Sequence, residues 1–295
     1  MQISFWRQGW RTLWRDLRSG ELRLLIAAVT LAVAALTAVG FFADRLKGGL
    51  QRDARQLLGG DAVVSSDNPT PEAFIAKARE LGLTVAGTLG FPTMGRAPDA
   101  SGGASKLVAL KVVEPGYPLR GSLKITRQPG TPETSTRDIP AAGEAWVDAP
   151  LLESLGLKMG DTLLLGDASF RISTVIVIEP DRGAGFMNFA PRVMINRADV
   201  DATKLIQPAS RLTYRMAVAG TDAQVKRFVD WADVEIKNRA VRGLRVESLE
   251  GGRPEMRQTL DRAEKFLNLV ALLAALLSAV AVALAARGFA ASHLD

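Results

Sequence analysis

The sequence predicts an α+β membrane protein in which two transmembrane helices flank a large outer α+β domain. Residues 24–43 and 266–286 form two runs, of twenty and twenty-one residues, that contain no charged side chain. A helix rises about 1.5 Å per residue, so each run spans about 30 Å, the thickness of the hydrocarbon core of a bilayer. The alternative, a pair of buried core helices, fits less well, because core helices of this length almost always carry polar residues on one side.

The charges beside the first run predict the orientation. Residues 1–23 contain five arginines against one Asp and one Glu. Positive residues next to a first span stay in the cytoplasm. We therefore expect a multi-pass protein of a bacterial inner (plasma) membrane, with a cytoplasmic N-terminus and a periplasmic domain. A cleaved signal peptide is not expected, because the apolar run is too long and GFFADR offers no suitable cleavage site.

Residues 1–23 are also predicted to form an amphipathic helix along the cytoplasmic membrane surface. At helical spacing, tryptophan and leucine fall on one stripe and arginine on a neighbouring stripe, which suits the headgroup region of a bilayer. The alternative is an ordinary solvated run of charges. The residues expected at the membrane interface are Trp6, Arg7, Trp10, Arg11, Trp14, Arg15 and Arg18.

The composition argues against an enzyme. The chain has no cysteine and a single histidine, His293, close to its end. Disulfides, thiolate metal sites and a Ser/His/Asp triad therefore lack their residues, and no metal or cofactor is expected. No phosphate-binding G-x-x-x-x-G-K-[ST] run occurs, so ATP hydrolysis would need a partner. The net charge of +6 is explained by the N-terminal arginines rather than by nucleic-acid binding.

The outer domain is predicted to stand on two helical stalks and to begin and end with similar β-α-β units. Residues 44–60 continue the first span as a stalk helix that ends at Gly59 and Gly60, and residues 251–265 form a charged stalk helix before the second span. The first unit, residues 61–127, contains strands at 62–66, 84–91 and 106–113 and a helix that opens at Thr70 and Pro71. The second unit, residues 207–250, contains strands at 211–219 and 244–249 and a helix over 221–238 with a Thr221/Gln224 capping box. Together the units suggest one split α+β domain.

A different module is predicted between them. Residues 128–143, rich in Pro, Gly, Thr and Ser, are interpreted as a linker. Residues 144–206 are interpreted as a β-rich insert with a short helix ending at Gly156, a hairpin turning at Gly166 and Asp167, and a strand at 192–196.

The segment DRGAGFMNFAPR, residues 181–192, is the most unusual part of the domain, because it carries Phe186, Met187 and Phe189 on a glycine-containing turn. One interpretation is a hairpin tip whose aromatic rings fold back on the sheet. The other is an exposed apolar contact for a periplasmic partner or a lipid-like substrate.

Two further blocks carry a resemblance to a known family. The stretch AWVDAPLLESLGLKMGDTLLL resembles the outer domain of FtsX-like permeases of the MacB type, and VVEPGYPLRGSL is similar to the YbbP-type branch. The resemblance implies a split porter-like part with an inserted sabre-like part, and an ABC transporter whose separate cytoplasmic ATPase drives motion of the periplasmic domain. Family members have more spans, so the chain resembles an N-terminal fragment, with residues 287–295 beginning the cytoplasmic coupling region.

The sequence therefore predicts a permease subunit of an ABC transporter, engaged in mechanotransmission or in export of amphipathic compounds. Its expected partners are a cytoplasmic ABC ATPase, the lipid bilayer, and a periplasmic protein or amphipathic substrate. The alternative is a two-span transmembrane sensor with a periplasmic ligand-binding domain.

Overall fold

The computed structural model describes residues 21–128, 130–183, 189–208, 210–238, 243–248 and 254–293. They divide into two compact units, residues 1–50 with 255–295, and residues 51–254. Several residues predicted to make contacts lie outside the described part of the chain, and their predicted roles stay predictions: Trp6, Arg7, Trp10, Arg11, Trp14, Arg15, Arg18, Phe186 and Met187.

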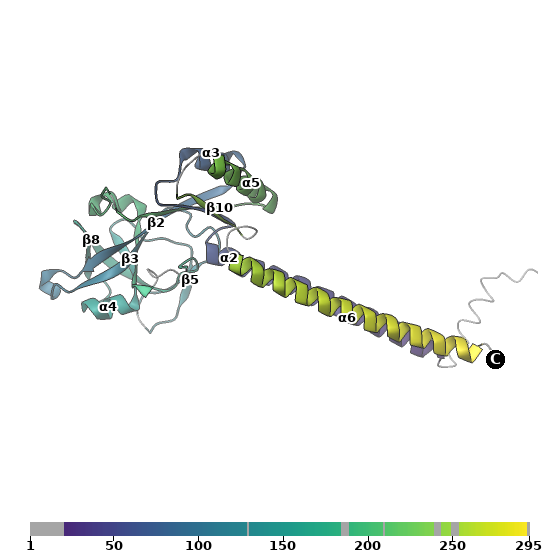
Figure 1. Ribbon diagram of the computed structural model, residues 1–295. Coiled ribbons are helices and arrows are strands. Elements are labelled where there is room, and N and C mark those ends of the chain that lie inside the picture. Colours follow the sequence, from purple (N-terminus) through teal and green to yellow (C-terminus); the bar gives the residue numbers. More distant parts are fainter. Residues whose placement is uncertain are drawn as a thin grey trace, which may run out of the picture. The chain divides into compact units, whose positions relative to one another are not determined.

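Long helices dominate the first unit. They are α6, Pro254–His293, and most of α2, Glu21–Leu58 (Figure 1). Large apolar side chains are exposed along both, for example Leu31 at 77% in α2 and Leu277 at 71% in α6. Apolar surface of this extent suits contact with lipid or with another helix rather than with water.

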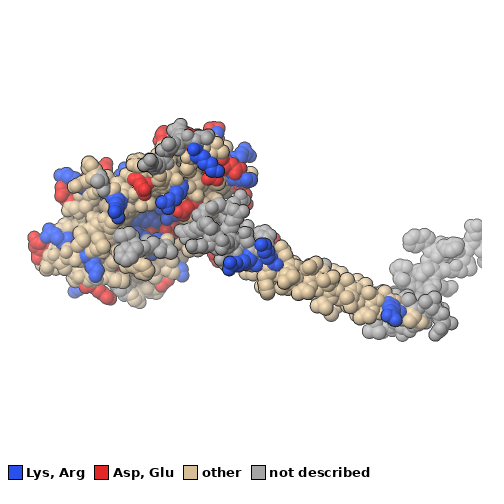
Figure 2. All heavy atoms as spheres, in the orientation of Figure 1, with Lys and Arg blue, Asp and Glu red and all other residues tan. Residues whose placement is uncertain are grey.

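One segment in the described part of the chain, Lys265–Leu284, is long and apolar enough to cross a membrane, with a mean hydropathy of 2.5 and no buried residue. It coincides with the second predicted span. In Figure 2 the middle of α6 is covered by uncharged side chains, and Lys or Arg atoms gather toward both ends. The first predicted span, residues 24–43, lies inside the uninterrupted helix α2. That this segment also crosses the membrane stays a prediction.

The second unit is built on one sheet, which has eleven strands in the described residues. Its order is β11-β1-β10-β2-β3-β9-β6-β8-β4-β5, and β7 pairs with both β2 and β8. The strands are β1 (Ala62–Ser66), β2 (Thr84–Arg96), β3 (Ser105–Val113), β4 (Leu123–Thr126), β5 (Thr134–Thr136), β6 (Glu144–Asp148), β7 (Thr162–Leu165), β8 (Ala168–Ile178), β9 (Arg192–Asn196), β10 (Thr213–Ala219) and β11 (Arg245–Ser248).

The two β-α-β units interleave at one end of this sheet. Strand β10 lies between β1 and β2, and β1 lies between β10 and β11, with every pair antiparallel. Helices α3 (Glu72–Glu80) and α5 (Asp222–Asn238) pack over one face, where Phe74 and Phe228 are fully buried (Figure 1). The Thr221/Gln224 capping box is confirmed, since Thr221 N donates to Gln224 Oε1 at 2.9 Å. The helix predicted to open at Thr70 and Pro71 begins at Glu72, with Pro71 at its N-cap and no side-chain bond there.

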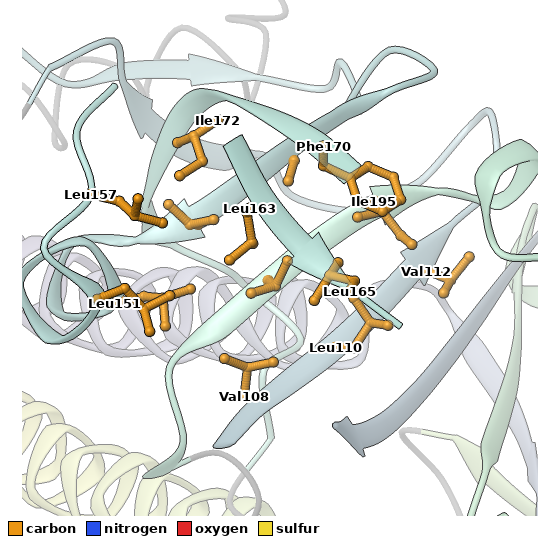
Figure 3. Close-up of a cluster of buried hydrophobic side chains, with 14 of the residues drawn as sticks. Val108, Leu110, Val112, Leu151, Leu157, Leu163, Leu165, Phe170, Ile172 and Ile195 are labelled. Carbon is orange, nitrogen blue, oxygen red and sulfur yellow. The ribbon is translucent and has the colours of Figure 1, made fainter. Parts of the chain in front are cut away.

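The central strands carry a second core, drawn in Figure 3, beneath the helix α4 (Ala149–Leu155). The LGLKMGD block closes this core. Gly156 ends α4 in the left-handed conformation, Leu157 is buried, and the Asp161 carboxylate accepts the backbone N–H of Lys158 at 2.8 Å. The predicted hairpin at Gly166 and Asp167 is confirmed by the pairing of Leu165 with Ala168.

The sheet runs through all the predicted parts of the domain. Strand β3, from the first unit, pairs in parallel with β9 of the predicted insert, and β2 pairs with β7. The predicted linker contains β5, which forms a hairpin with β4. These long-range pairings leave the insert without a sheet of its own, and the division into porter-like and sabre-like parts stays a proposal.

Candidate functional site

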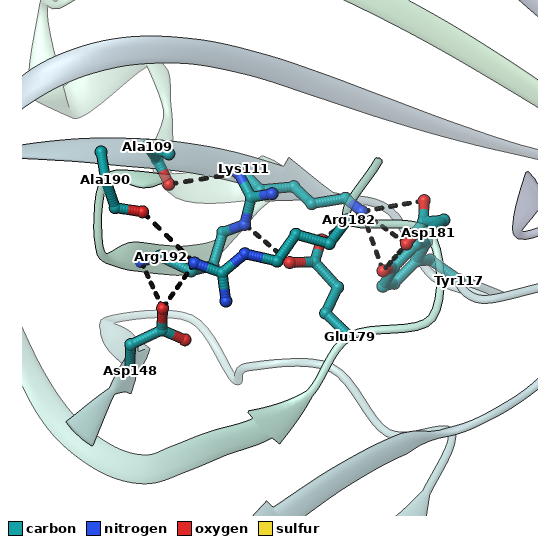
Figure 4. Close-up of polar contacts among 9 residues, drawn as sticks. All are labelled: Ala109, Lys111, Tyr117, Asp148, Glu179, Asp181, Arg182, Ala190 and Arg192. Atoms are coloured by element: carbon teal, nitrogen blue, oxygen red, sulfur yellow. Dashed lines mark hydrogen bonds and ion pairs between the residues drawn. The ribbon is translucent and has the colours of Figure 1, made fainter. Parts of the chain in front are cut away.

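The segment singled out from the sequence, residues 181–192, begins and ends in a network of buried charges (Figure 4). Phe189, the aromatic residue in the described part of this segment, is 86% exposed, and both interpretations of the segment stay predictions. Arg192 begins β9, and β9 lies beside β3, which brings Lys111 into the same region. The candidate site is therefore the base of this segment, called here the loop base: Lys111, Tyr117, Asp148, Glu179, Asp181, Arg182 and Arg192.

Asp148 holds the two ends of the loop together. Its Oδ2 atom accepts a bond from Arg182 Nη2 at 2.8 Å and a bond from the backbone N–H of Arg192 at 2.9 Å. Arg182 Nη2 also donates to the carbonyl of Ala190 at 3.3 Å. The loop thus leaves and re-enters the domain at fixed points on either side of one carboxylate (Figure 4).

Glu179 joins Lys111 to Arg192. Its Oε1 accepts from Lys111 Nζ and its Oε2 from Arg192 Nε, each at 2.6 Å, and its side chain has no exposed surface. Such charge-assisted bonds are among the strongest in proteins. They fix β3 and β9 together through side chains as well as through the backbone ladder.

Asp181 completes the network. Lys111 Nζ donates to both of its oxygens, at 2.8 and 2.9 Å, and Tyr117 Oη donates to Oδ1 at 2.5 Å. Burial by itself would raise the pKa of Asp181, but the charge of Lys111 and the bonds from Lys111 and Tyr117 outweigh burial and lower that pKa. Burial, followed by the charge of Asp181, raises the pKa of Tyr117 well above its ordinary value. Asp181 is therefore held ionised and Tyr117 protonated.

The loop base has balanced charge, because Lys111, Arg182 and Arg192 face Asp148, Glu179 and Asp181. Each carboxylate accepts at least two hydrogen bonds, so no nucleophile or base is left poised for chemistry. In the described residues, no group of three or more His, Asp or Glu side chains could hold a metal. The arrangement positions a loop and offers no catalytic chemistry.

A second buried carboxylate, Asp61, joins the end of α2 to the domain. It accepts two bonds from Arg120, from Nε at 2.9 Å and Nη2 at 2.6 Å, and a third from the backbone N–H of Gly220 at 3.0 Å. The bond to Asp61 raises the pKa of Arg120. Arg55, in the last turn of α2, lies 3.6 Å from Asp61 and donates to Asp222 at 2.7 Å. We call Arg55, Asp61 and Arg120 the α2 joint.

Gly59, the residue that follows α2, lies close to the loop base. Gly59, which ends α2, has a φ of 73°, and a Cβ atom there would lie 3.1 Å from the Cβ and the Oδ2 of Asp181. The backbone N–H of Arg120 also donates to the carbonyl of Gly59 at 3.3 Å. Glycine is therefore required both by the backbone angle and by the closeness of Asp181. The end of α2 therefore lies beside Asp181 of the loop base.

Sequence reasoning found the loop but missed the residues that hold it. Lys111 was included in a predicted strand without a role, although a lysine between apolar residues in KLVALKVV is a signal for a buried ion pair. Glu179 and Asp181 similarly follow the apolar run VIVI. Their partners lie 68 and 70 residues away, so neither pairing could be read from spacing.

Comparison with known proteins identifies a homologue. The chain is 35% identical over 285 residues to an uncharacterized ABC transporter permease, YbbP, of Escherichia coli, and the match covers 97% of the chain. The chain is a homologue of this ABC transporter permease. It spans 34% of that relative's length. The homology confirms the resemblance to the YbbP-type permeases and agrees with the expectation that the chain is not an enzyme. No protein-family profile matches the chain.

Two solved structures resemble the fold at low sequence identity. The periplasmic region of MacB from Actinobacillus actinomycetemcomitans is 10% identical with a TM-score of 0.42, and the match covers 70% of this chain and 95% of that one. A domain of a permease protein from Porphyromonas gingivalis is 12% identical with a TM-score of 0.38, over 64% and 89% of the two chains. Both TM-scores lie below 0.5, so the relationship to known proteins rests on the sequence match to the permease.

Proposed function

We propose that this chain acts within the membrane permease subunit of an ABC transporter, where a cytoplasmic partner ATPase drives motion of the periplasmic domain formed by residues 51–254. The observation that carries the proposal is the homology to an ABC transporter permease over 97% of the chain. The exposed apolar surface of Lys265–Leu284 supports a place in the membrane. The sensor alternative draws no support from the homology.

The mechanism we propose is mechanical. Helix α2 is continuous from Glu21 to Leu58, so a tilt at its start is carried along the helix to its end. There Asp61 receives bonds from Arg120 and Gly220, which belong to two separate segments of the domain. A buried carboxylate with this many donors resists separation, because an unpaired charge would be left without water. The α2 joint thus makes the domain follow the helix.

The loop base extends this path to the segment that carries Phe186, Met187 and Phe189. Gly59 lies close to Asp181. Lys111 bonds both Asp181 and Glu179, and Glu179 also bonds Arg192. Movement of α2 would therefore reach the loop through packed, ion-paired groups. In this proposal the loop contacts a periplasmic protein or an amphipathic substrate, and its position follows the nucleotide state of the ATPase.

The first experiment isolates the protein from its own membranes with its partners. Tagged full-length protein is purified in mild detergent, and the co-purified proteins are identified and assayed for ATP hydrolysis. We expect an ABC ATPase that hydrolyses ATP in the complex. A complex that contains a kinase or cyclase and no ATPase would favour a sensor and contradict the proposal.

A second experiment tests the mechanical part. Arg120→Gln removes the two bonds to Asp61 at the domain side of the α2 joint. We expect the variant to retain ATP hydrolysis but to lose the coupled transport or extraction activity. Lys226→Ala, which removes an exposed ion pair with Asp230 on α5, is the matched control and keeps both activities. Full coupling in Arg120→Gln would rule out the α2 joint as the transmitting contact.

A further inference from the structure

A cavity of about 260 Å³ lies on the helix-covered side of the interleaved strands, away from the loop base. Its walls come from α3, from β2 and β10, and from the short helix η3, Arg197–Asp199, at the end of β9. Segments far apart in the sequence therefore meet around it. The lining residues on which the proposal depends are Ile75, Arg79, Glu114, Arg197, Tyr214 and Met216.

Glu114 is held in a fixed position at this cavity. Its Oε2 accepts the backbone N–H of Gly87 at 3.1 Å, and its own backbone N–H donates to the carbonyl of Gly87 at 3.3 Å. A Cβ atom at Gly87 would lie 2.5 Å from Oε2, so the absence of a side chain at Gly87 leaves room for the carboxylate in this position. Glycine inside a strand often marks such a close approach. The second oxygen, Oε1, has no partner among the described residues.

Three arginines line the same cavity, Arg79, Arg197 and Arg215, and none forms an ion pair with Glu114 within the described residues. Arg79 has no hydrogen bond or ion pair from its side chain within the described part of the chain, and the ion pair of Arg197 is a contact of 3.8 Å with Asp201. Opposite charges that share a small cavity but do not meet can be bridged by a molecule that carries both charges.

The remaining wall is apolar with one polar group. Ile75 and Met216 belong to or pack against the core under α3 and α5, and the Tyr214 hydroxyl has no hydrogen bond within the described residues. A ligand site of this kind combines apolar surface with a few placed polar groups that set orientation.

We propose that this cavity binds a small zwitterion, an α-amino acid with an aliphatic side chain. Its carboxylate meets Arg79 and Arg197, because guanidinium groups suit planar carboxylates. Its ammonium group donates to Glu114 Oε1, and its side chain packs on Ile75 and Met216. The arginines of the cavity outnumber its one acidic side chain, so a ligand needs a carboxylate, which a simple amine lacks. This site is independent of the ATPase and of the α2 joint.

The test is direct binding to full-length protein in nanodiscs, measured by calorimetry with L-leucine as the probe. We expect saturable binding below about 10 mM. Two analogues test the zwitterion requirement: 4-methylpentanoic acid lacks the ammonium group and isopentylamine lacks the carboxylate. Each should bind about tenfold more weakly or worse, since each loses a charge-assisted bond. Absence of L-leucine binding, or equal binding of all three probes, overturns the proposal.

Two variants assign the binding to this cavity. Glu114→Gln keeps an acceptor for Gly87 N–H, so the fold is retained while the charge is lost. Arg79→Gln changes an α3 side chain that has no partner within the described residues. Both variants should weaken L-leucine binding about tenfold. Arg171→Gln, which removes an ion pair with Glu144 that does not line the cavity, is the control and should leave the affinity unchanged. Hydrogen exchange of the Gly87 amide checks that both variants fold. If both bind L-leucine with unchanged affinity, the ligand binds elsewhere and the proposed site is refuted.

Discussion

Replacing Lys111 with methionine tests the energetic role of the loop base. The variant removes the cation that joins Glu179 to Asp181 and keeps an apolar side chain of similar length. Glu179 retains Arg192, but Asp181 retains only the bond from Tyr117 within the described network. The side chains of Lys111, Glu179 and Asp181 are 8%, 0% and 5% exposed, so water cannot replace the lost partner.

The expected loss of stability follows from this burial. Breaking a buried ion pair by removing one partner costs about 3–5 kcal/mol. In a domain of this size, 1 kcal/mol lowers the melting temperature by about 2–4 °C, so the loss corresponds to about 6–20 °C. Trp146, which packs in the same buried cluster as Tyr117, provides a fluorescence signal for unfolding of this region.

The pH dependence of the loss has a definite sign. In the parent protein the pKa of Asp181 is lower in the folded state than in the unfolded state, where it is about 4. The ionised carboxylate therefore stabilises the fold above the unfolded-state pKa, and this stabilisation is lost as the pH falls through the folded-state pKa. Without Lys111, burial raises the pKa of Asp181 instead, so lowering the pH toward 5 stabilises the variant relative to the parent. Lys111→Met combined with Asp181→Asn should recover part of the loss. Two results would refute this account: a Lys111→Met variant as stable as the parent at pH 7, or a loss of stability in that variant that grows as the pH falls from 7 to 5.

Other predictions concern packing, the hairpin and the joint. Phe228→Ala should cost about 3–5 kcal/mol in denaturant unfolding, because its ring is fully buried under α5, and a parental midpoint would contradict that packing. Gly166→Ala should destabilise the domain by at least about 1–3 kcal/mol, because φ is 57° and the new Cβ would lie 2.0 Å from the Thr203 carbonyl oxygen. Calorimetry measures this loss of stability. The control variant Ala168→Gly should lose at most about 1 kcal/mol. Asp61→Asn should raise hydrogen exchange at the amide of Gly220 and near Gly59, and unchanged exchange at both would exclude the α2 joint as a stabilising contact.

Local features of the domain could be predicted because they depend on neighbouring residues. The strands predicted at 62–66 and 192–196 match the bounds of β1, Ala62–Ser66, and of β9, Arg192–Asn196. The capping box at Thr221 and the left-handed turn at Gly156 each use side chains or angles within four residues of one another. Such features need no knowledge of the tertiary fold.

The buried charge clusters could not be predicted in the same way. Asp61 receives bonds from residues 59 and 159 positions away, and Asp148 bonds Arg192 across 44 positions. Which cation meets which carboxylate depends on the order of strands, above all on β9 lying between β3 and β6. That order places the insert within the sheet of the flanking units. A lysine or aspartate inside an apolar strand signals that a partner exists but does not name it.

The proposed arrangement, a permease domain held outside the membrane by flanking helices, is tested most directly by site-specific labelling. Because the chain has no cysteine, Ser101→Cys at the exposed turn after β2 introduces a unique thiol. In intact Escherichia coli spheroplasts producing the full chain, a membrane-impermeant maleimide should label this thiol fully, and the cysteine-free parent should stay unlabelled. Labelling only after the membrane is permeabilised would place residues 51–254 in the cytoplasm and contradict the account.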